Sequence, residues 1–173
     1  MTVEMPDEAR ASFEDHDAFE RAADGYRLTT TAFDATVTAT AGEDWRTHYT
    51  VTVEVPTLDA AVADDAEDVG DAVLAGWLET FERRLADATQ ATRASVDLDA
   101  FSVERVGETV TVRYEFAFGN DARAVKIAKT LVEYVEGTYV EGVVPGYEYE
   151  SPVTDLLSAA ATDGTGERGG TPL

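Results

Sequence analysis

The stretch TVTVRYEFAF, residues 109–118, carries the clearest structural signal of the chain. Its apolar residues alternate with threonine, arginine and glutamate, and in a strand this alternation places the two kinds on opposite faces. Strands that bury one face and leave the other in water are typical of antiparallel sheets. The preceding residues 101–105, FSVER, favour a second strand, and residues 106–108 between the two predict a tight hairpin turn.

The same alternation occurs earlier in the chain. FDATVTAT (33–40) and YTVTVEV (49–55) both alternate, with residues 41–44, AGED, as a turn and Pro56 as the end of the second strand. Asp24 and Gly25 lie between two short runs and are typical of a hairpin turn. We therefore interpret residues 19–29 as a hairpin, while continuation of the first helix to residue 23 stays open as the alternative.

Helical spacing of apolar residues predicts the remaining elements. Residues 6–15 begin with a proline and two acids, which favour a helix start. Residues 69–88 place their large apolar side chains on one helical face. Asn120 or Asp121 is a suitable cap for a helix from residue 122 to about 141, and Ser151 with Pro152 can start a short last helix.

The order of these elements predicts the fold class. A helix, three or four strands, a helix, two strands, a helix and a short C-terminal helix indicate an α+β fold in two layers, with an antiparallel sheet of about five to six strands and helices on one face. The length of 173 residues suits one domain, which we place at residues 1–160. The small, polar, Gly-rich segment 161–173 is expected to be a disordered tail.

The composition is strongly acidic. The chain carries 35 acidic and 13 basic residues, a net charge of −22, whereas a small domain usually carries a magnitude of about 2–8. Such a chain repels itself unless salt screens the charges, and near 1 M salt the Debye length falls to about 3 Å. We therefore expect a cytoplasmic protein from a halophilic archaeon, and the charge argues against nucleic acid as a partner.

Several classes of protein are disfavoured by what the sequence lacks. There is no cysteine, which excludes disulfides, thiolate zinc sites and cysteine nucleophiles. No apolar run approaches the length of a membrane span, so we expect no membrane association. The N-terminus is acidic and does not have the pattern of a signal peptide.

No catalytic, cofactor-binding or metal-binding residues are predicted. The acidic run EDHD (14–17) is interpreted as a solvated surface, because its members point around a helix end instead of converging on an ion. Gly164, Gly166 and Gly169 match the G-x-G-x-x-G pattern, but no strand precedes them and no helix follows, so they do not predict a phosphate site. The G-x-S-x-G nucleophile pattern is absent. The protein is therefore expected not to be an enzyme.

Arg123, Lys126 and Lys129 are the first candidate partner-binding residues. They contain both lysines of the chain and share one face of the predicted helix, near its positive end, where cations are unfavourable. Residues placed against the local electrostatic preference of a helix can mark a functional site. The simpler interpretation, which we favour, is that these cations pair with carboxylates such as Glu133, four residues after Lys129.

Tyr147 and Tyr149 are the second candidates. They lie in YVEGTYVEGVVPGYEYESP (134–152), where a Gly and a Pro-Gly pair predict the end of the helix and a turn. In an extended segment both rings point to the same side. They either hold the chain end over the core, which we favour, or form an aromatic rim for a protein partner.

The segments FEDHDAFE, DAVLAGWLETFERRL and LVEYVEGTYVEGVVPGYEYESPVTDLL resemble a haloarchaeal family of short acidic proteins of unknown function, over residues 6–160. Separately, the element order is similar to the type III secretion chaperone-like fold, and this resemblance implies a homodimer or an adaptor that holds a protein partner. The expected function is a non-enzymatic, cytosolic protein-binding, adaptor or chaperone-like module. The alternative is a small-molecule-binding protein or an unrecognised enzyme with a pocket lined by Tyr or Trp.

Overall fold

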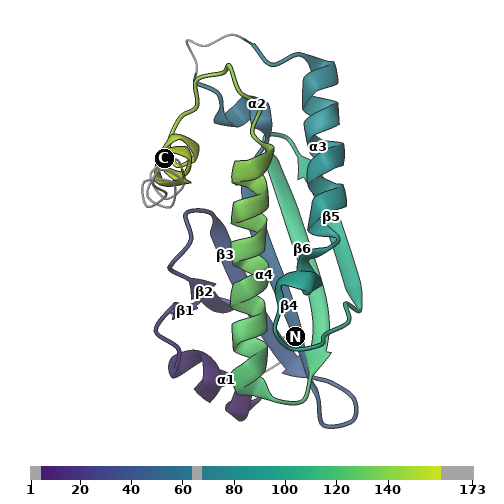
Figure 1. The fold of residues 1–173 in the computed structure, drawn as a ribbon. Coiled ribbons are helices and arrows are strands. Elements are labelled where there is room, and N and C mark those ends of the chain that lie inside the picture. The colour runs from purple at the N-terminus through teal and green to yellow at the C-terminus, as the bar shows by residue number, and fades with distance from the viewer. Residues whose placement is uncertain (1–4, 64–67, 161–173) are drawn as a thin grey trace, which may run out of the picture.

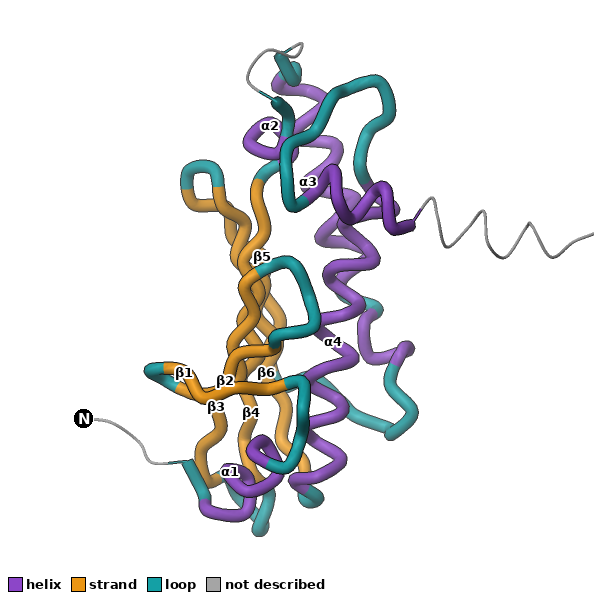
Figure 2. Tube along the Cα trace, turned by 90° about the vertical axis from the view of Figure 1, so that its left-hand side faces the viewer, coloured by secondary structure: helices purple, strands orange, loops and turns teal. Residues whose placement is uncertain are grey.

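The computed structural model describes residues 5–63 and 68–160. Its strands form one antiparallel sheet of six strands in the order β1-β2-β3-β4-β6-β5. Helices cover one face of this sheet, and Figure 2 shows the two layers edge-on. The structure thus confirms the predicted two-layer α+β fold with helices on one side.

The element bounds follow the predicted ranges closely. The strands are β1 (Phe19–Ala22), β2 (Gly25–Leu28), β3 (Asp34–Ala41), β4 (Thr47–Pro56), β5 (Ala100–Val106) and β6 (Thr109–Phe118). The helices, shown in Figure 1, are α1 (Asp7–Glu14), α2 (Leu58–Ala61), α3 (Asp71–Leu85), the 3₁₀ helix η1 (Ala88–Ala91) and α4 (Asp121–Gly142). Residues 153–160 form a further helical segment.

Alternation along β4 and β6 sets which side chains enter the core. Val51 lies opposite Tyr114 and both are fully buried, because inward residues of neighbouring antiparallel strands share a face. The intervening pair Thr52 and Arg113 points to the other face, which no helix covers. Because only one face of the sheet is buried, apolar and polar residues alternate along these strands in the sequence.

Helix α4 packs along the covered face of the sheet and is buried over a wide stripe. Tyr139 of α4 forms an aromatic cluster with Trp77 and Phe81 of α3, with ring centroids 5.3–5.8 Å apart. The Tyr139 ring also contacts Phe33 in the loop before β3, at a centroid distance of 4.9 Å. The contacts of Tyr139 with Trp77 and Phe81 are edge-to-face and the Trp77–Phe81 contact is stacked, and aromatic pairs of both kinds stabilise a core beyond the area that they bury. The buried side chains of α4 are Ala124, Val125, Ile127, Ala128, Leu131, Val132, Val135, Thr138 and Tyr139.

The N-terminal hairpin and the long helices confirm the sequence predictions in detail. Phe19 pairs with Leu28 across the turn at Asp24 and Gly25, so residues 19–28 form a hairpin and not a continued helix. Four strands precede α3, the larger of the two numbers expected. Asn120 caps α4, because its side chain accepts a hydrogen bond from the backbone N–H of Arg123 at 3.0 Å.

Other boundaries differ from the predicted ones. Strand β4 begins at Thr47, and the preceding turn spans residues 43–46 instead of 41–44. Helix α2 lies between the predicted strand and the predicted helix at 69–88, where the sequence predicts no element; the Thr57 side chain accepts from the Ala60 N–H and starts a single helical turn. Helix α3 ends at Leu85 instead of residue 88, and η1 begins at Ala88 and continues into a stretch for which the sequence predicts no element. The segment 161–173, with its three motif glycines, lies outside the described residues.

Candidate functional site

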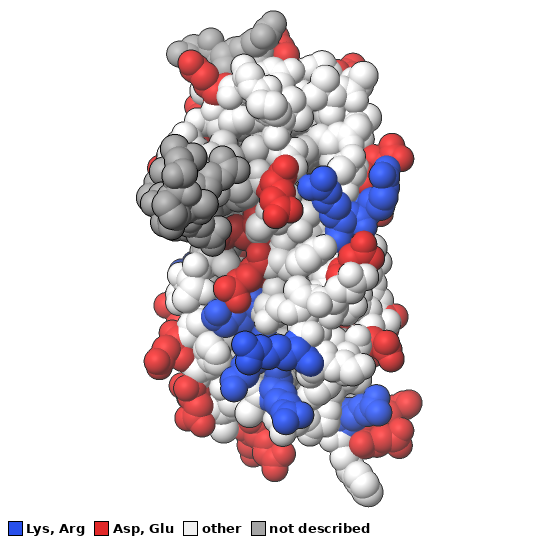
Figure 3. Space-filling model, in the orientation of Figure 1, with Lys and Arg blue, Asp and Glu red and all other residues white. Residues whose placement is uncertain are grey.

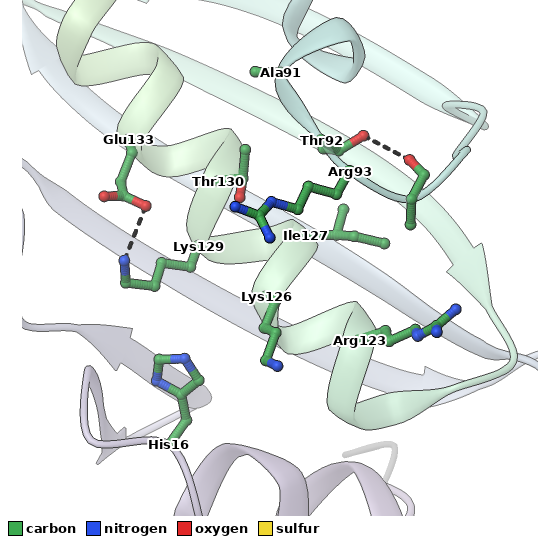
Figure 4. A pocket seen from close by; sticks show the side chains of 11 residues that line it. His16, Ala91, Thr92, Arg93, Arg123, Lys126, Ile127, Lys129, Thr130 and Glu133 are labelled. Atoms are coloured by element: carbon green, nitrogen blue, oxygen red, sulfur yellow. Dashed lines mark hydrogen bonds and ion pairs between the residues drawn. The ribbon is translucent and has the colours of Figure 1, made fainter.

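A groove of about 650 Å³ lies on the helical side of the molecule, along the N-terminal half of α4. The residues after η1 form one wall, and the segment that follows α1 reaches it from the other side (Figure 4). The lining residues are His16, Ala91, Thr92, Arg93, Ala94, Arg123, Lys126, Ile127, Lys129, Thr130 and Glu133.

Helix geometry explains why α4 contributes most of this lining. Residues three and four apart lie on one helical face, so Arg123, Lys126 and Lys129 project together from α4. The opposite face packs into the core through buried residues such as Ala124 and Ala128. Arg123 and Lys126 are exposed and Lys129 is half-buried, as expected for the side of a helix that faces a groove.

Arg93 and His16 join these residues from distant parts of the chain. In Figure 4, Arg93 extends toward α4 near Thr130, and His16 faces Lys126 from the other side. The Thr92 hydroxyl oxygen lies 2.7 Å from the Thr89 carbonyl oxygen, which fixes the turn that presents Arg93. The Nδ1 atom of His16 accepts a hydrogen bond from the Ala18 N–H at 3.2 Å, so Nε2 is the nitrogen left to donate.

The charges in the groove are poorly compensated. Lys129 forms an ion pair with Glu133, with Nζ 3.0 Å from Oε1. Within the described residues, no ion pair joins Arg93, Arg123 or Lys126 to a carboxylate. Figure 3 shows Lys and Arg atoms gathered over the lower half of α4, on a chain whose net charge is −22. The groove is thus a local cationic surface on an acidic protein.

The structure brings together one of the two predicted groups of residues. Arg123, Lys126 and Lys129 line one groove, and the expected ion pair between Lys129 and Glu133 is present. Sequence reasoning did not include Arg93 or His16. The available signal was weak, since Arg93 is simply the one basic residue in the polar segment 89–99.

Tyr147 and Tyr149 lie away from this groove, in the segment that follows α4. Tyr149 forms an isolated antiparallel bridge with Val62, and its hydroxyl donates to the Val144 carbonyl oxygen at 2.5 Å. Burial raises the pKa of the Tyr149 hydroxyl above its usual range. These contacts hold the chain end against the segment after α2, while a partner-binding role for the two tyrosines stays a prediction.

Residues 5–63 and 68–160 contain neither a metal-binding cluster nor a helix that could span a membrane. No group of three or more His, Asp or Glu side chains there is arranged to hold a metal ion, and this includes the acidic run at residues 14–17. The helices in that part of the chain are too short or too polar to cross a bilayer.

Comparison with known proteins gives a family but no activity. The model of DUF5813, described as a family of unknown function, matches residues 14–159, which include all of the groove residues. No curated protein and no solved structure matches the chain.

Proposed function

The chain belongs to DUF5813, a family of unknown function, and we propose that it is a cytosolic protein-binding module whose cationic groove holds an acidic segment of a partner protein. The observation that carries this proposal is the gathering of three cations in one groove, Arg93, Arg123 and Lys126, none of which forms an ion pair within the described residues. The chain has 35 acidic residues, yet Glu133 is the one carboxylate among the described lining residues of this groove, and it pairs with Lys129.

The placement of these cations favours a negatively charged ligand. Arg123 and Lys126 lie in the first turns of α4, where the helix dipole already makes the surroundings positive and raises the energy of a cation. An anion in the groove is attracted by both the side chains and the dipole. Arginine and lysine only donate hydrogen bonds, so they suit a ligand rich in carboxylate oxygens.

The shape of the cationic surface favours a peptide segment over a single small anion. The lining residues of α4 run from Arg123 to Glu133, and ten helical residues rise by about 15 Å. An extended chain covers that length with about four or five residues. Ile127, Ala91 and Ala94 lie among the charged side chains, so the groove also offers contacts to an apolar side chain of the same segment.

The acidic composition supports the cytosolic setting of this proposal, and the groove supports an adaptor role. The net charge of −22 suits a cytosol with molar salt, such as that of a halophilic archaeon. An adaptor or chaperone-like role is consistent with a groove that binds a segment of another protein.

The test is a titration of the full chain with a fluorescein-labelled acidic peptide, Glu-Asp-Leu-Glu-Asp, followed by fluorescence anisotropy over a series of KCl concentrations. We expect the double variant Arg123→Ala/Lys126→Ala to bind at least about tenfold more weakly, because both substitutions remove charge from the groove. Arg105→Ala, an exposed arginine on β5, is the matched control and should bind as the unmodified chain does. Equal affinity of the double variant and the unmodified chain would overturn the proposal.

A further inference from the structure

The turn between β3 and β4 exposes a tryptophan completely. Trp45 is 100% exposed, and the other exposed large apolar residues of the described chain, Val73 and Val106, are far smaller. Trp77, by contrast, is buried in the core. A fully exposed indole gains none of the free energy that burial of a tryptophan side chain normally provides. Packing within this chain therefore does not explain the position of Trp45.

The backbone of this turn disfavours tryptophan. Asp44 and Trp45 have φ angles of 55° and 61°, and the Arg46 N–H donates to the Glu43 carbonyl oxygen at 3.0 Å. Two positive φ angles at the centre of a hairpin turn are the pattern of a type I′ turn, whose second central position favours glycine. A bulky residue there is an outlier, and such outliers concentrate at functional sites.

The chemistry of the turn restricts what it can bind. Glu43 and Asp44 precede the indole, so the segment Glu43–Trp45, which we call the acidic tip, combines two carboxylates with one large aromatic ring. Such a tip is repelled by phosphates and by the surface carboxylates of a chain whose net charge is −22. It fits a site that has cations around an apolar floor, and the groove along α4 has both.

We propose that two copies of this chain form a symmetric dimer, in which the acidic tip of each copy occupies the cationic groove of the other. This rests on the proposed function and names the partner of the groove as a second copy. Away from these contacts the two copies repel each other, and molar salt screens that repulsion.

The positions of the tip and the groove permit such an exchange. Thr47, directly after the turn, pairs with Phe118, and α4 begins three residues later at Asp121. The Tyr49 hydroxyl donates to the Asp121 carboxylate, which ties β4 to the start of α4. Tip and groove therefore lie at the same end of the molecule (Figure 1), where a two-fold axis can bring each tip to the partner's groove.

The test is the mass of the full chain in molar KCl, measured by sedimentation equilibrium. We expect a dimer, and we expect Trp45→Gly to weaken it at least about tenfold, as loss of a central aromatic anchor commonly does. Glycine is favoured at this turn position, so the variant should fold as well as the unmodified chain. Val106→Thr, at an exposed apolar residue on β5, is the control and should dimerise normally.

A mixing experiment tests the reciprocal contact. Trp45→Gly keeps an intact groove and Arg123→Ala/Lys126→Ala keeps an intact tip, so a mixed dimer retains one unmodified tip–groove contact, whereas a homodimer of either variant retains none. Heterodimers should therefore outnumber either homodimer when the two variants are mixed. A monomeric unmodified chain, or a Trp45→Gly variant that dimerises normally, would overturn the inference. If the unmodified chain is monomeric but still binds the labelled acidic peptide, the inference fails and the proposed function stands. If peptide binding is also absent, both fail.

Discussion

Tyr114 and Tyr139 show how differently two fully buried residues of one type can be stabilised. Both rings lie in the core, but the Tyr114 hydroxyl donates to the Leu85 carbonyl oxygen at 2.8 Å. Within the described residues, the Tyr139 hydroxyl has no hydrogen-bond partner. Burial raises the pKa of both hydroxyls beyond their ordinary range, because the phenolate form would be poorly solvated.

Because of this difference in hydrogen bonding, replacing each tyrosine with phenylalanine should affect the free energy of unfolding differently. Tyr114→Phe should lower the free energy of unfolding by about 1–1.5 kcal/mol, because it leaves the Leu85 carbonyl without its donor. Tyr139→Phe should change it by less than about 0.5 kcal/mol or stabilise the protein, because it removes an unpaired polar atom. Urea unfolding of both variants in molar KCl measures the difference. Equal losses would contradict the assignment of partners.

Among the elements, α4 links the core to the groove. Its inward stripe fixes the helix on the sheet, and its outward face presents Arg123, Lys126 and Lys129. The helix starts where Asn120 satisfies a backbone N–H that would otherwise lack an intrahelical partner. The cap therefore determines where along the chain the cationic face begins.

Loss of the Asn120 side-chain cap should destabilise α4. Asn120→Ala should lower the free energy of unfolding by about 1 kcal/mol, whereas Asn120→Asp should preserve it, because aspartate also accepts from the N–H of Arg123. Thermal unfolding followed by circular dichroism measures both variants. If alanine and aspartate behave alike, the side-chain cap does not stabilise α4.

Much of the element structure could be predicted from the sequence, because one-sided burial leaves a regular period. That period identified β3 to β6 and α4. Helix α2 was missed because four residues are too few for a period, and its main local signal is the Thr57 cap. Likewise the groove could be predicted only in part, since Arg123, Lys126 and Lys129 share a helix face but no local pattern connects them to Arg93 or His16. Tryptophan disfavours the left-handed backbone conformation, so the conformation of Trp45 could not be predicted from the sequence.

For the whole molecule, net charge is the dominant global property. A charge of −22 on a chain of 173 residues creates repulsion between distant surface carboxylates that no individual ion pair offsets. The ion pairs in the described residues are mostly between exposed side chains, and such pairs contribute little to stability. Stability should therefore depend on the ionic strength of the solvent.

Dialysis from molar to millimolar KCl should loosen or unfold the protein, because the Debye length then exceeds the spacing of surface charges. Circular dichroism at each salt concentration measures the transition. A variant that carries Glu8→Gln, Glu82→Gln and Asp87→Asn, all at exposed positions, should need less salt to stay folded. An unchanged spectrum of the unmodified chain at millimolar KCl would show that self-repulsion is not decisive.

The strand order has a consequence for how the chain reaches this structure. Strand β4 pairs with β3 across a short turn, but all of its residues also pair with β6, where Val51 meets Tyr114 from far along the chain. The two hairpin-connected groups, β1 to β4 and β5 to β6, can form locally, whereas the β4–β6 ladder requires closure of a long loop. We infer that this ladder forms in the rate-limiting step, so truncating Val51 should slow folding, while truncating Leu28 in β2 should mainly speed unfolding.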